Sequence, residues 1–321
     1  MIVCTFNRCQ ILSSALESVA ASQLPGYAEW EVLVVDNNSR DQTFSVVDEF
    51  CKRFPGRFRY LFESQPGKSH ALNRGIREAR GDILAFMDDD VIVETAWLLN
   101  LTISLGDSQW IGAGGKTLPA QNVKLPRWLG FEPPYNMGGV LCAYFNLGDE
   151  ACELHEAPYG ANMAFRKEAF EKYGGFRIDL GPQPGSELRN EDTEFGRRVL
   201  AAGERLRYEP SAVVYHPVPV DRMRKDYFLA WYFDFGRANV REWEPKPDIL
   251  GIPRRCFNFI RMLGTVLPVR TVRWLITLNP KRRFFRKCWL WTTVGQMVEC
   301  RRQWRDAAAQ THKFTKGVNR G

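Results

Sequence analysis

The chain has 321 residues, 45% of them hydrophobic, which is enough to bury the core of one large domain or of two smaller ones. Its eight cysteines are scattered, without a C-x-x-C pair or a histidine at zinc spacing, which argues against a zinc site and against a dense disulfide framework. No run approaches about 18 uninterrupted apolar residues, and the first ten residues do not match a secretory signal peptide, so we expect neither a membrane-spanning helix nor a leader.

The net charge of +7 is distributed unevenly along the chain. Residues 1–253 contain 28 Lys and Arg against 35 Asp and Glu, whereas residues 254–321 contain 16 Lys and Arg against two acids. An acidic body followed by a basic C-terminal region indicates two different tasks or two different surroundings.

Strand and helix patterns alternate over the first ninety residues. We expect strands at 1–6, 30–36, 58–64 and 83–87, and helices at 10–22, 43–54 and 67–80. Helices of ten to fifteen residues between strands are typical of right-handed crossovers. The sequence therefore predicts an α/β fold with a mostly parallel sheet.

Ligands of such sheets gather outside the carboxyl ends of the strands. The four expected strand ends carry polar residues, namely 5–8, 36–37, 63–64 and 88–90. The sequence has neither the G-x-G-x-x-G pattern of dinucleotide-binding folds nor a P-loop, so a bound nucleotide would need another partner for its phosphates. A divalent cation held by aspartates could supply it.

Asp88, Asp89 and Asp90 directly follow the apolar strand 83–87. The nearest preceding basic residue in sequence is Arg80, so no close neighbour in the chain relieves the repulsion among the three carboxylates. Like-charged clusters at strand ends favour a cation site. The alternative is a solvated turn in which Asp90 caps a helix at 94–105.

The middle of the chain, residues 106–225, is less regular and rich in Gly, Pro and aromatic residues. We expect a helix at 193–202 preceded by Glu191 and Asp192, then a short edge strand that ends near His216. Acids at a helix start also complement the helix dipole, and a lone histidine is more often a structural hydrogen-bonding residue than a ligand. Both alternatives stay open at this point.

Six motifs occur in an order that resembles the family 2 glycosyltransferases over about residues 1–220. They are TFNR, VVDNNSRDQT, GKSHALNRGIREARGDILAFMDDD, GANMAFRKEAF, NEDTEFGRRV and YEPSAVVYHP. The resemblance implies a GT-A fold, with a mostly parallel, Rossmann-like sheet flanked by helices and followed here by a basic helical C-terminal extension. It also implies inverting transfer of a sugar from a nucleoside diphosphate donor, preferably a UDP-sugar, to a hydroxyl acceptor, with Mn²⁺ or Mg²⁺ as cofactor.

The resemblance also implies roles for individual residues. Donor binding is implied for Thr5, Asn7, Arg8, Asp36, Lys68, Asn73 and Asp88. Asp90 matches the direct metal ligand of the D-x-D motif, Asp88 its ribose or metal contact, and His216 an additional metal ligand. Asp192 matches the catalytic base, and Asn162 and Glu191 are candidates on the acceptor side. Asn37 departs from the family pattern, where an acid is common, and leaves the preference for the nucleotide base open.

We expect a GT-A domain at 1–225, divided into a nucleotide-sugar half (1–105) and an acceptor half (106–225), and a basic amphipathic region at 226–321. Residues 254–300 alternate apolar clusters with Arg and Lys. Such a helix suits an anionic membrane surface, where each basic residue contributes about 1 kcal/mol. This predicts a peripheral enzyme on the cytoplasmic membrane face whose acceptor is a lipid-linked or cell-surface glycan. The alternative is that these helices only cover the catalytic domain.

Two other functions remain open at this stage. FMDDDVIV also fits the strand end of haloacid dehalogenase-like phosphatases, with Asp88 as nucleophile, although that motif normally follows the first strand. A non-enzymatic protein that binds an anionic surface through its basic region is the second alternative. Nothing in the sequence resembles a nucleic-acid-binding module, so we expect no nucleic-acid partner.

Overall fold

The computed structural model describes residues 1–321 except 27, 122–123, 132, 185–187, 243–253 and 319–321. The chain forms two compact units. Residues 1–124 and 138–220 form the first, which we call the sheet unit, and residues 125–137 and 221–321 form the second, the helical unit.

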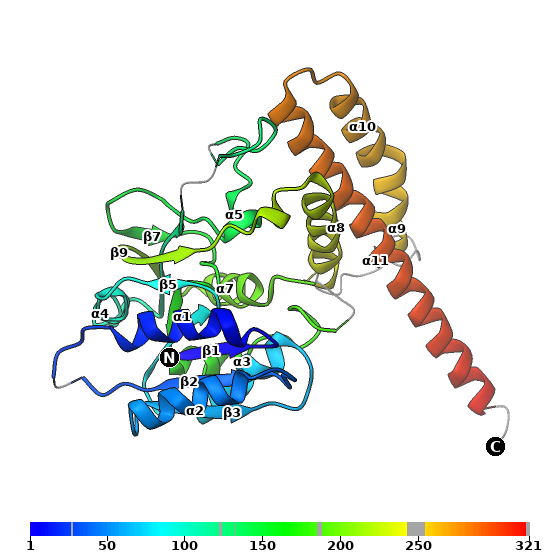
Figure 1. The fold of residues 1–321 in the computed structure, drawn as a ribbon. Helices are drawn as coiled ribbons and strands as arrows, with labels where there is room; N and C mark the ends of the chain where they lie inside the picture. Colours follow the sequence, from blue (N-terminus) through cyan, green and yellow to red (C-terminus); the bar gives the residue numbers. More distant parts are fainter. Residues whose placement is uncertain (27, 122–123, 132, 185–187, 243–253, 319–321) are drawn as a thin grey trace. The chain divides into compact units, whose positions relative to one another are not determined.

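The strands of the sheet unit belong to one mixed sheet (Figure 1). They are β1 (Ile2–Thr5), β2 (Val32–Asp36), β3 (Phe58–Phe62), β4 (Ile83–Asp88), β5 (Ile92–Val93), β6 (Gly112–Pro119), β7 (Cys152–Leu154), β8 (Met163–Arg166) and β9 (Leu206–His216). Their order is β3-β2-β1-β4-β8-β6-β9-β5, with β7 on β9. The first four strands run parallel to one another, and β8 lies antiparallel between β4 and β6. The expected α/β class with a mostly parallel sheet is therefore confirmed.

Helices cover both faces of this sheet because its strands are apolar on both sides. The helices are α1 (Cys9–Ala20), α2 (Thr43–Arg53), α3 (Lys68–Glu78), α4 (Trp97–Ile103), α5 (Gly138–Cys142), α6 (Lys167–Tyr173) and α7 (Glu191–Ala201). Side chains of α1, α2 and α4 share a core with Val3 and Val34, whereas those of α3, α6 and α7 share another with Ile2 and Leu33. Alternate residues of one strand thus enter opposite cores, as the pleat requires.

The elements expected over the first ninety residues are confirmed, with ends that differ by a few residues. The expectation of a short edge strand before His216 is wrong, because β9 has eleven residues and pairs with β6, β5 and β7. Pro210 lies inside β9, where the register between β6 and β9 shifts between Gly115 and Lys116. A bulge of this kind lets a proline lie inside a paired strand.

The helical unit contains α8 (Lys225–Glu242), α9 (Arg254–Arg261), the π-helical turn η2 (Met262–Val266), α10 (Leu267–Leu275) and α11 (Pro280–Val318); a short 3₁₀ turn, η1 (Val220–Arg222), precedes α8. Helices α8 and α11 approach closely at Gly236 and Gly295, where an added Cβ would lie 2.1 Å from the Thr292 oxygen and 2.0 Å from the Phe233 oxygen. The basic helical C-terminal extension is confirmed. Among the described residues no helix is both long and apolar enough to cross a membrane.

Candidate functional site

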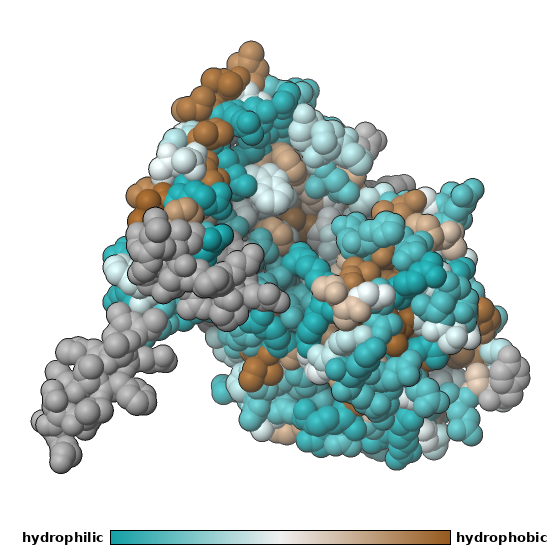
Figure 2. Space-filling model, turned by 180° about the vertical axis from the view of Figure 1, so that it is seen from behind, coloured by the Kyte–Doolittle hydropathy of each residue, from teal (hydrophilic) through white to brown (hydrophobic). Residues whose placement is uncertain are grey.

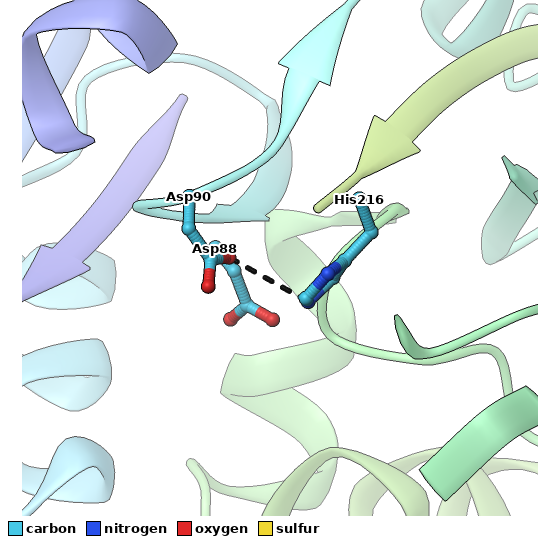
Figure 3. A group of neighbouring side chains, drawn as sticks. All are labelled: Asp88, Asp90 and His216. Carbon is cyan, nitrogen blue, oxygen red and sulfur yellow. Dashed lines mark ion pairs between the residues drawn. The ribbon is translucent and has the colours of Figure 1, made fainter. Parts of the chain in front are cut away.

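The ends of two strands bring Asp88 and Asp90 close to His216, which lies far from them in the sequence. Strand β4 ends at Asp88, and the chain turns at Asp89 and Asp90 before β5. Because β5 pairs antiparallel with the end of β9, with Ile92 opposite Tyr215, His216 comes to lie beside this turn. Figure 3 shows Asp88, Asp90 and His216 pointing toward one another. One ligand atom from each lies within 4.8 Å of the others, so the group could hold a metal ion.

The surroundings of Asp90 and His216 fit such an ion. Asp90 Oδ1 is buried and has no hydrogen-bond partner, and it lies 3.6 Å from His216 Nε2. His216 Nδ1 lies 2.8 Å from the Pro217 carbonyl oxygen, which can only accept, so Nδ1 carries the proton and Nε2 presents its lone pair to the carboxylate. Two lone pairs facing each other in a buried site are stabilised by a cation between them, and a carboxylate–imidazole set suits Mn²⁺ or Mg²⁺.

Lys68 connects the metal candidates with the start of α7. Its ammonium donates to Asp88 Oδ1 at 2.7 Å and lies 3.5 Å from Glu191 Oε1. Burial acts against this charge, yet Asp88 and Glu191 raise the pKa of Lys68 well above its ordinary value. Burial also acts to raise the pKa of Asp88, but Lys68 outweighs it and lowers that pKa to about 2. Asp88 is therefore ionised at neutral pH, as a metal ligand must be.

Asp89 is a site residue that the sequence did not reveal. Although it lies between two candidate metal ligands in a polar turn, its side chain is buried. It accepts hydrogen bonds from the Thr5 hydroxyl at 2.7 Å and from Arg8 at 2.9 Å. Arg8 also lies 3.2 Å from Asp90, so it neutralises part of the acidic cluster across the sheet. The positive charges that the sequence lacks locally thus come from Arg8 and Lys68.

The acids at the start of α7 differ in their surroundings. Glu191 is buried, and burial raises its pKa although Lys68 opposes the shift. Asp192 is half-buried; its Oδ2 accepts from the Gly160 N–H at 2.6 Å and its Oδ1 accepts from the Thr193 N–H at 2.7 Å. Backbone donors therefore hold the Asp192 carboxylate in one orientation while its remaining lone pairs stay available to a proton donor.

A second polar group lies at the ends of β1 and β2. Asn7 has a left-handed backbone, with φ of 52°, and its side-chain oxygen accepts from the Arg40 N–H at 2.7 Å. Asp36 accepts from the Ser39 N–H and from the Tyr60 hydroxyl, both at 2.8 Å. The Asn7 N–H donates to the Ser39 hydroxyl oxygen at 2.9 Å, so these residues form one continuous network. Thr5, Asn7, Arg8 and Asp36 thus lie at the carboxyl ends of the neighbouring strands β1 and β2.

Three asparagines singled out in the sequence bind mainly to neighbouring parts of the chain. Asn73 exchanges two hydrogen bonds of 2.8 Å with the backbone of Phe176. Asn162 is buried; its oxygen accepts from the Trp97 indole, and its nitrogen donates to the carbonyls of residues 116 and 212. Asn37 accepts from the Gly67 N–H at 2.7 Å and so shapes the turn into α3. Gly67 has φ of 128°, which only glycine adopts readily.

The family description Glycosyl transferase family 2 matches residues 1–174 of this chain. Succinoglycan biosynthesis protein ExoM of Rhizobium meliloti is 28% identical over 249 residues, which cover 74% of this chain and 73% of that protein. The glucosyl-dolichyl phosphate glucuronosyltransferase of Haloferax volcanii is 23% identical over 233 residues, or 71% of this chain and 72% of that protein.

A solved structure shares the fold. The mannosyltransferase PcManGT from Pyrobaculum calidifontis, solved in complex with GDP-Man and Mn²⁺, aligns with a TM-score of 0.56 and 20% sequence identity. The alignment covers 99% of this chain and 78% of that one. The similarity confirms the expected GT-A type of fold.

Proposed function

Since this chain belongs to glycosyltransferase family 2, we propose that it transfers a sugar from a nucleoside diphosphate donor, with UDP-sugars as the first choice, to an acceptor hydroxyl with inversion at the anomeric carbon. The observation that carries the proposal is the meeting of Asp88, Asp90 and His216 around a buried carboxylate oxygen without a partner. Family membership sets aside both alternatives, the phosphatase and the non-enzymatic surface-binding protein.

Asp88, Asp90 and His216 are the residues that would hold the divalent cation. When bound, the cation would stabilise the negative charge that develops on the departing diphosphate. Before the donor binds, Arg8 and Lys68 partly neutralise the three carboxylates of the cluster. Arg8 pairs with Asp89 and Asp90, and Lys68 pairs with Asp88.

The network of Asn7, Asp36 and Ser39 supports a nucleoside-binding role for the ends of β1 and β2. Their side chains and backbone groups lie on the strand edge where parallel sheets bind ligands. Thr5 would act through Asp89, to which its hydroxyl is bonded, whereas Asn7 is exposed and could contact the nucleoside itself.

Asp192 is the proposed base. The acceptor oxygen attacks the anomeric carbon as the bond from that carbon to the diphosphate oxygen breaks, and the acceptor proton passes to an Asp192 oxygen. The diphosphate leaves with the bonding electron pair, and attack from the opposite side inverts the centre. The hydrogen bonds from Gly160 and Thr193 support this role, because they hold the carboxylate without protonating it.

We propose a lipid-linked or cell-surface glycan acceptor for an enzyme of envelope polysaccharide synthesis, bound peripherally to the cytoplasmic membrane face. The names of the succinoglycan and dolichyl phosphate relatives support the acceptor class. The helical unit supports the membrane contact, since exposed apolar side chains follow one another along α9, η2 and α10 among basic residues. These side chains are Ile260, Leu263, Val269, Val272, Leu275, Ile276 and Leu278.

Release of nucleoside diphosphate from a panel of UDP-, GDP- and dTDP-sugars tests the proposal. We expect slow release from one donor with Mn²⁺ present and its loss in EDTA, with recovery when Mn²⁺ is added in excess. Equal release in EDTA and in Mn²⁺ would contradict the metal site. Release by an Asp149→Asn variant, which removes a carboxylate that is 96% exposed, should match that of the unmodified protein.

A further inference from the structure

The helical unit contains a pocket of about 390 Å³ between the 134–135 segment, α10 and the start of α11. Its lining consists of Pro134, Tyr135, Arg270, Arg273, Arg282, Phe285, Arg286 and Trp289. Four arginine side chains thus contribute to the lining of one cavity, together with aromatic rings and a proline, and most of the accessible lining is apolar. The volume is within the range of about 300 to 1,000 Å³ that is usual for small-molecule sites.

Two of these arginines are held in place by neutral acceptors. Arg270 donates to the Trp289 carbonyl and to the Thr293 hydroxyl, both at 2.6 Å. Arg286 donates to the Arg273 carbonyl at 2.8 Å and to the Thr277 hydroxyl. These bonds orient the guanidinium groups but leave their charge uncompensated. Two of the four pocket arginines are therefore held in one orientation.

Within the part of the chain that the structure describes, no carboxylate lies at ion-pair distance from any of the four pocket arginines. The same unit does pair arginines where an acid is present: Glu299 on α11 contacts Arg237, Arg241 and Arg302. Burial lowers the pKa of Arg270, which shows that desolvation acts against its charge, although an arginine stays protonated at neutral pH. An anion in the pocket would relieve both the desolvation and the mutual repulsion.

The same helix that supplies Arg270 and Arg273 also exposes apolar side chains to solvent. Val269, Val272 and Leu275 on α10 are each about half exposed, and Leu278, just beyond the helix, is 90% exposed. Figure 2 shows exposed apolar residues interspersed with hydrophilic ones on the face that it presents. Because exposed apolar side chains and pocket arginines come from the same helix, the head group of a lipid fits this part of the unit better than a free solute.

We propose that this arginine pocket binds a phosphomonoester or diphosphate head group of a membrane lipid, the chemical class to which the phosphate link of a lipid-carried acceptor belongs. This inference rests on the membrane association proposed above. A phosphomonoester carries between one and two negative charges at neutral pH and a diphosphate carries more, whereas the diester of an ordinary phospholipid carries one. Guanidinium groups bind such phosphates through paired hydrogen bonds, so four of them favour the more highly charged head group.

Flotation with phosphatidylcholine vesicles that contain either phosphatidic acid or phosphatidylglycerol tests the proposal, with both vesicle types matched in zeta potential. We expect about tenfold tighter binding to phosphatidic acid vesicles. A double variant, Arg273→Gln with Arg282→Gln, should abolish that preference. Both side chains are exposed and donate no hydrogen bond among the described contacts, so the thermal unfolding midpoint should stay unchanged.

The matched control is Arg261→Gln with Arg283→Gln, which removes two positive charges of the same unit outside the pocket lining. This variant should bind both vesicle types somewhat more weakly but keep the preference. Equal affinity of the unmodified protein for both vesicles, or an equal loss of preference in both double variants, would overturn the pocket assignment. Absence of binding to either vesicle would overturn it together with membrane association.

Inorganic pyrophosphate is the probe that distinguishes a soluble phosphate ligand from a lipid head group. If pyrophosphate raises the thermal midpoint of the unmodified protein, but not that of the pocket variant, and the phosphatidic acid preference is absent, the ligand is a soluble phosphate and the lipid assignment is wrong. None of these measurements needs donor, metal or turnover. A failure of the proposed sugar transfer would therefore appear only in the nucleotide-release assay.

Discussion

The two units of this protein arrange charge in opposite ways. In the sheet unit, Arg8 and Lys68 pair with Asp88, Asp89 and Asp90, and one buried carboxylate oxygen is left for a cation. In the helical unit, arginines outnumber acids, and among the described residues those that line the pocket have no carboxylate at ion-pair distance. The comparison teaches that the informative groups are those without a partner: the Oδ1 oxygen of Asp90 in the first unit and the charges of the pocket arginines in the second.

The largest expected effect follows from replacing Asp90, whose Oδ1 has no hydrogen-bond partner. Asp90→Asn should abolish metal-dependent turnover, because an amide is a poor ligand for a hard cation, and Asp88→Asn should weaken Mn²⁺ and donor binding together. Nucleotide release at rising Mn²⁺ concentrations measures both effects. Turnover of Asp90→Asn near that of the unmodified protein would place the metal elsewhere.

Asp192→Asn should lower transfer by about 10²- to 10⁴-fold while donor binding is retained, because the amide keeps the shape but cannot take the proton. The measurements are the transfer rate with a glycan acceptor and the donor affinity by calorimetry. The Asp149→Asn variant is the matched surface control. If Asp192→Asn transfers sugar at a normal rate, the base is another group, and Glu191, the neighbouring acid, is the first to be tested.

In the helical unit the corresponding test replaces Glu299, a buried acid that arginines do compensate. Glu299→Gln should destabilise this unit by about 3 kcal/mol, since it removes a fully buried negative charge that contacts Arg237, Arg241 and Arg302. Asp306→Asn, which affects an exposed pair with Arg302, should cost less than about 1 kcal/mol. Urea unfolding followed by circular dichroism compares the two variants, and equal effects would show that burial of the pair does not matter.

The lowered pKa of Glu299 predicts that the stability of the protein depends on pH. Burial alone would raise the pKa of Glu299, but Arg302 and Arg241 lower it to about 2. A carboxyl whose folded pKa is below its unfolded value of about 4.5 contributes stability above that value and loses it as the pH falls toward 2. The unmodified protein should therefore lose stability over this window, and Glu299→Gln should lose less. Parallel curves for the two proteins would contradict the assignment.

The smallest expected effect concerns the apolar side chains of the helical unit. Ile276→Ser with Leu278→Ser should weaken vesicle binding by about tenfold through lost apolar burial, without changing the preference for phosphatidic acid. Flotation at low and high salt measures this effect, because the apolar contribution does not depend on salt whereas that of the arginines does. A loss of the head-group preference in this variant would mean that the arginine pocket does not act separately from the apolar surface.

The sequence by itself determined the α/β class and the positions of the early elements. Apolar runs such as 83–87 and helical spacing such as that of 43–54 are local patterns, and local patterns decide which element forms. It also located Asp88, Asp90, Asp192 and His216 as candidates, because family motifs mark short segments. The true place of β9 in the sheet was missed, since pairing with β6 and the bulge near Pro210 depend on residues about a hundred positions away.

Only the tertiary structure decided how the charges pair. Arg8 and Lys68 reach the aspartates across 81 and 20 residues of chain, and Asp89 proved to be a buried partner of Thr5 and Arg8. The arginine pocket joins residues 134–135 with 270–289, which no sequence window contains together. Whether a charge is compensated depends on distances of a few ångströms between distant segments, and these distances are set by the packing of the whole unit rather than by any local pattern.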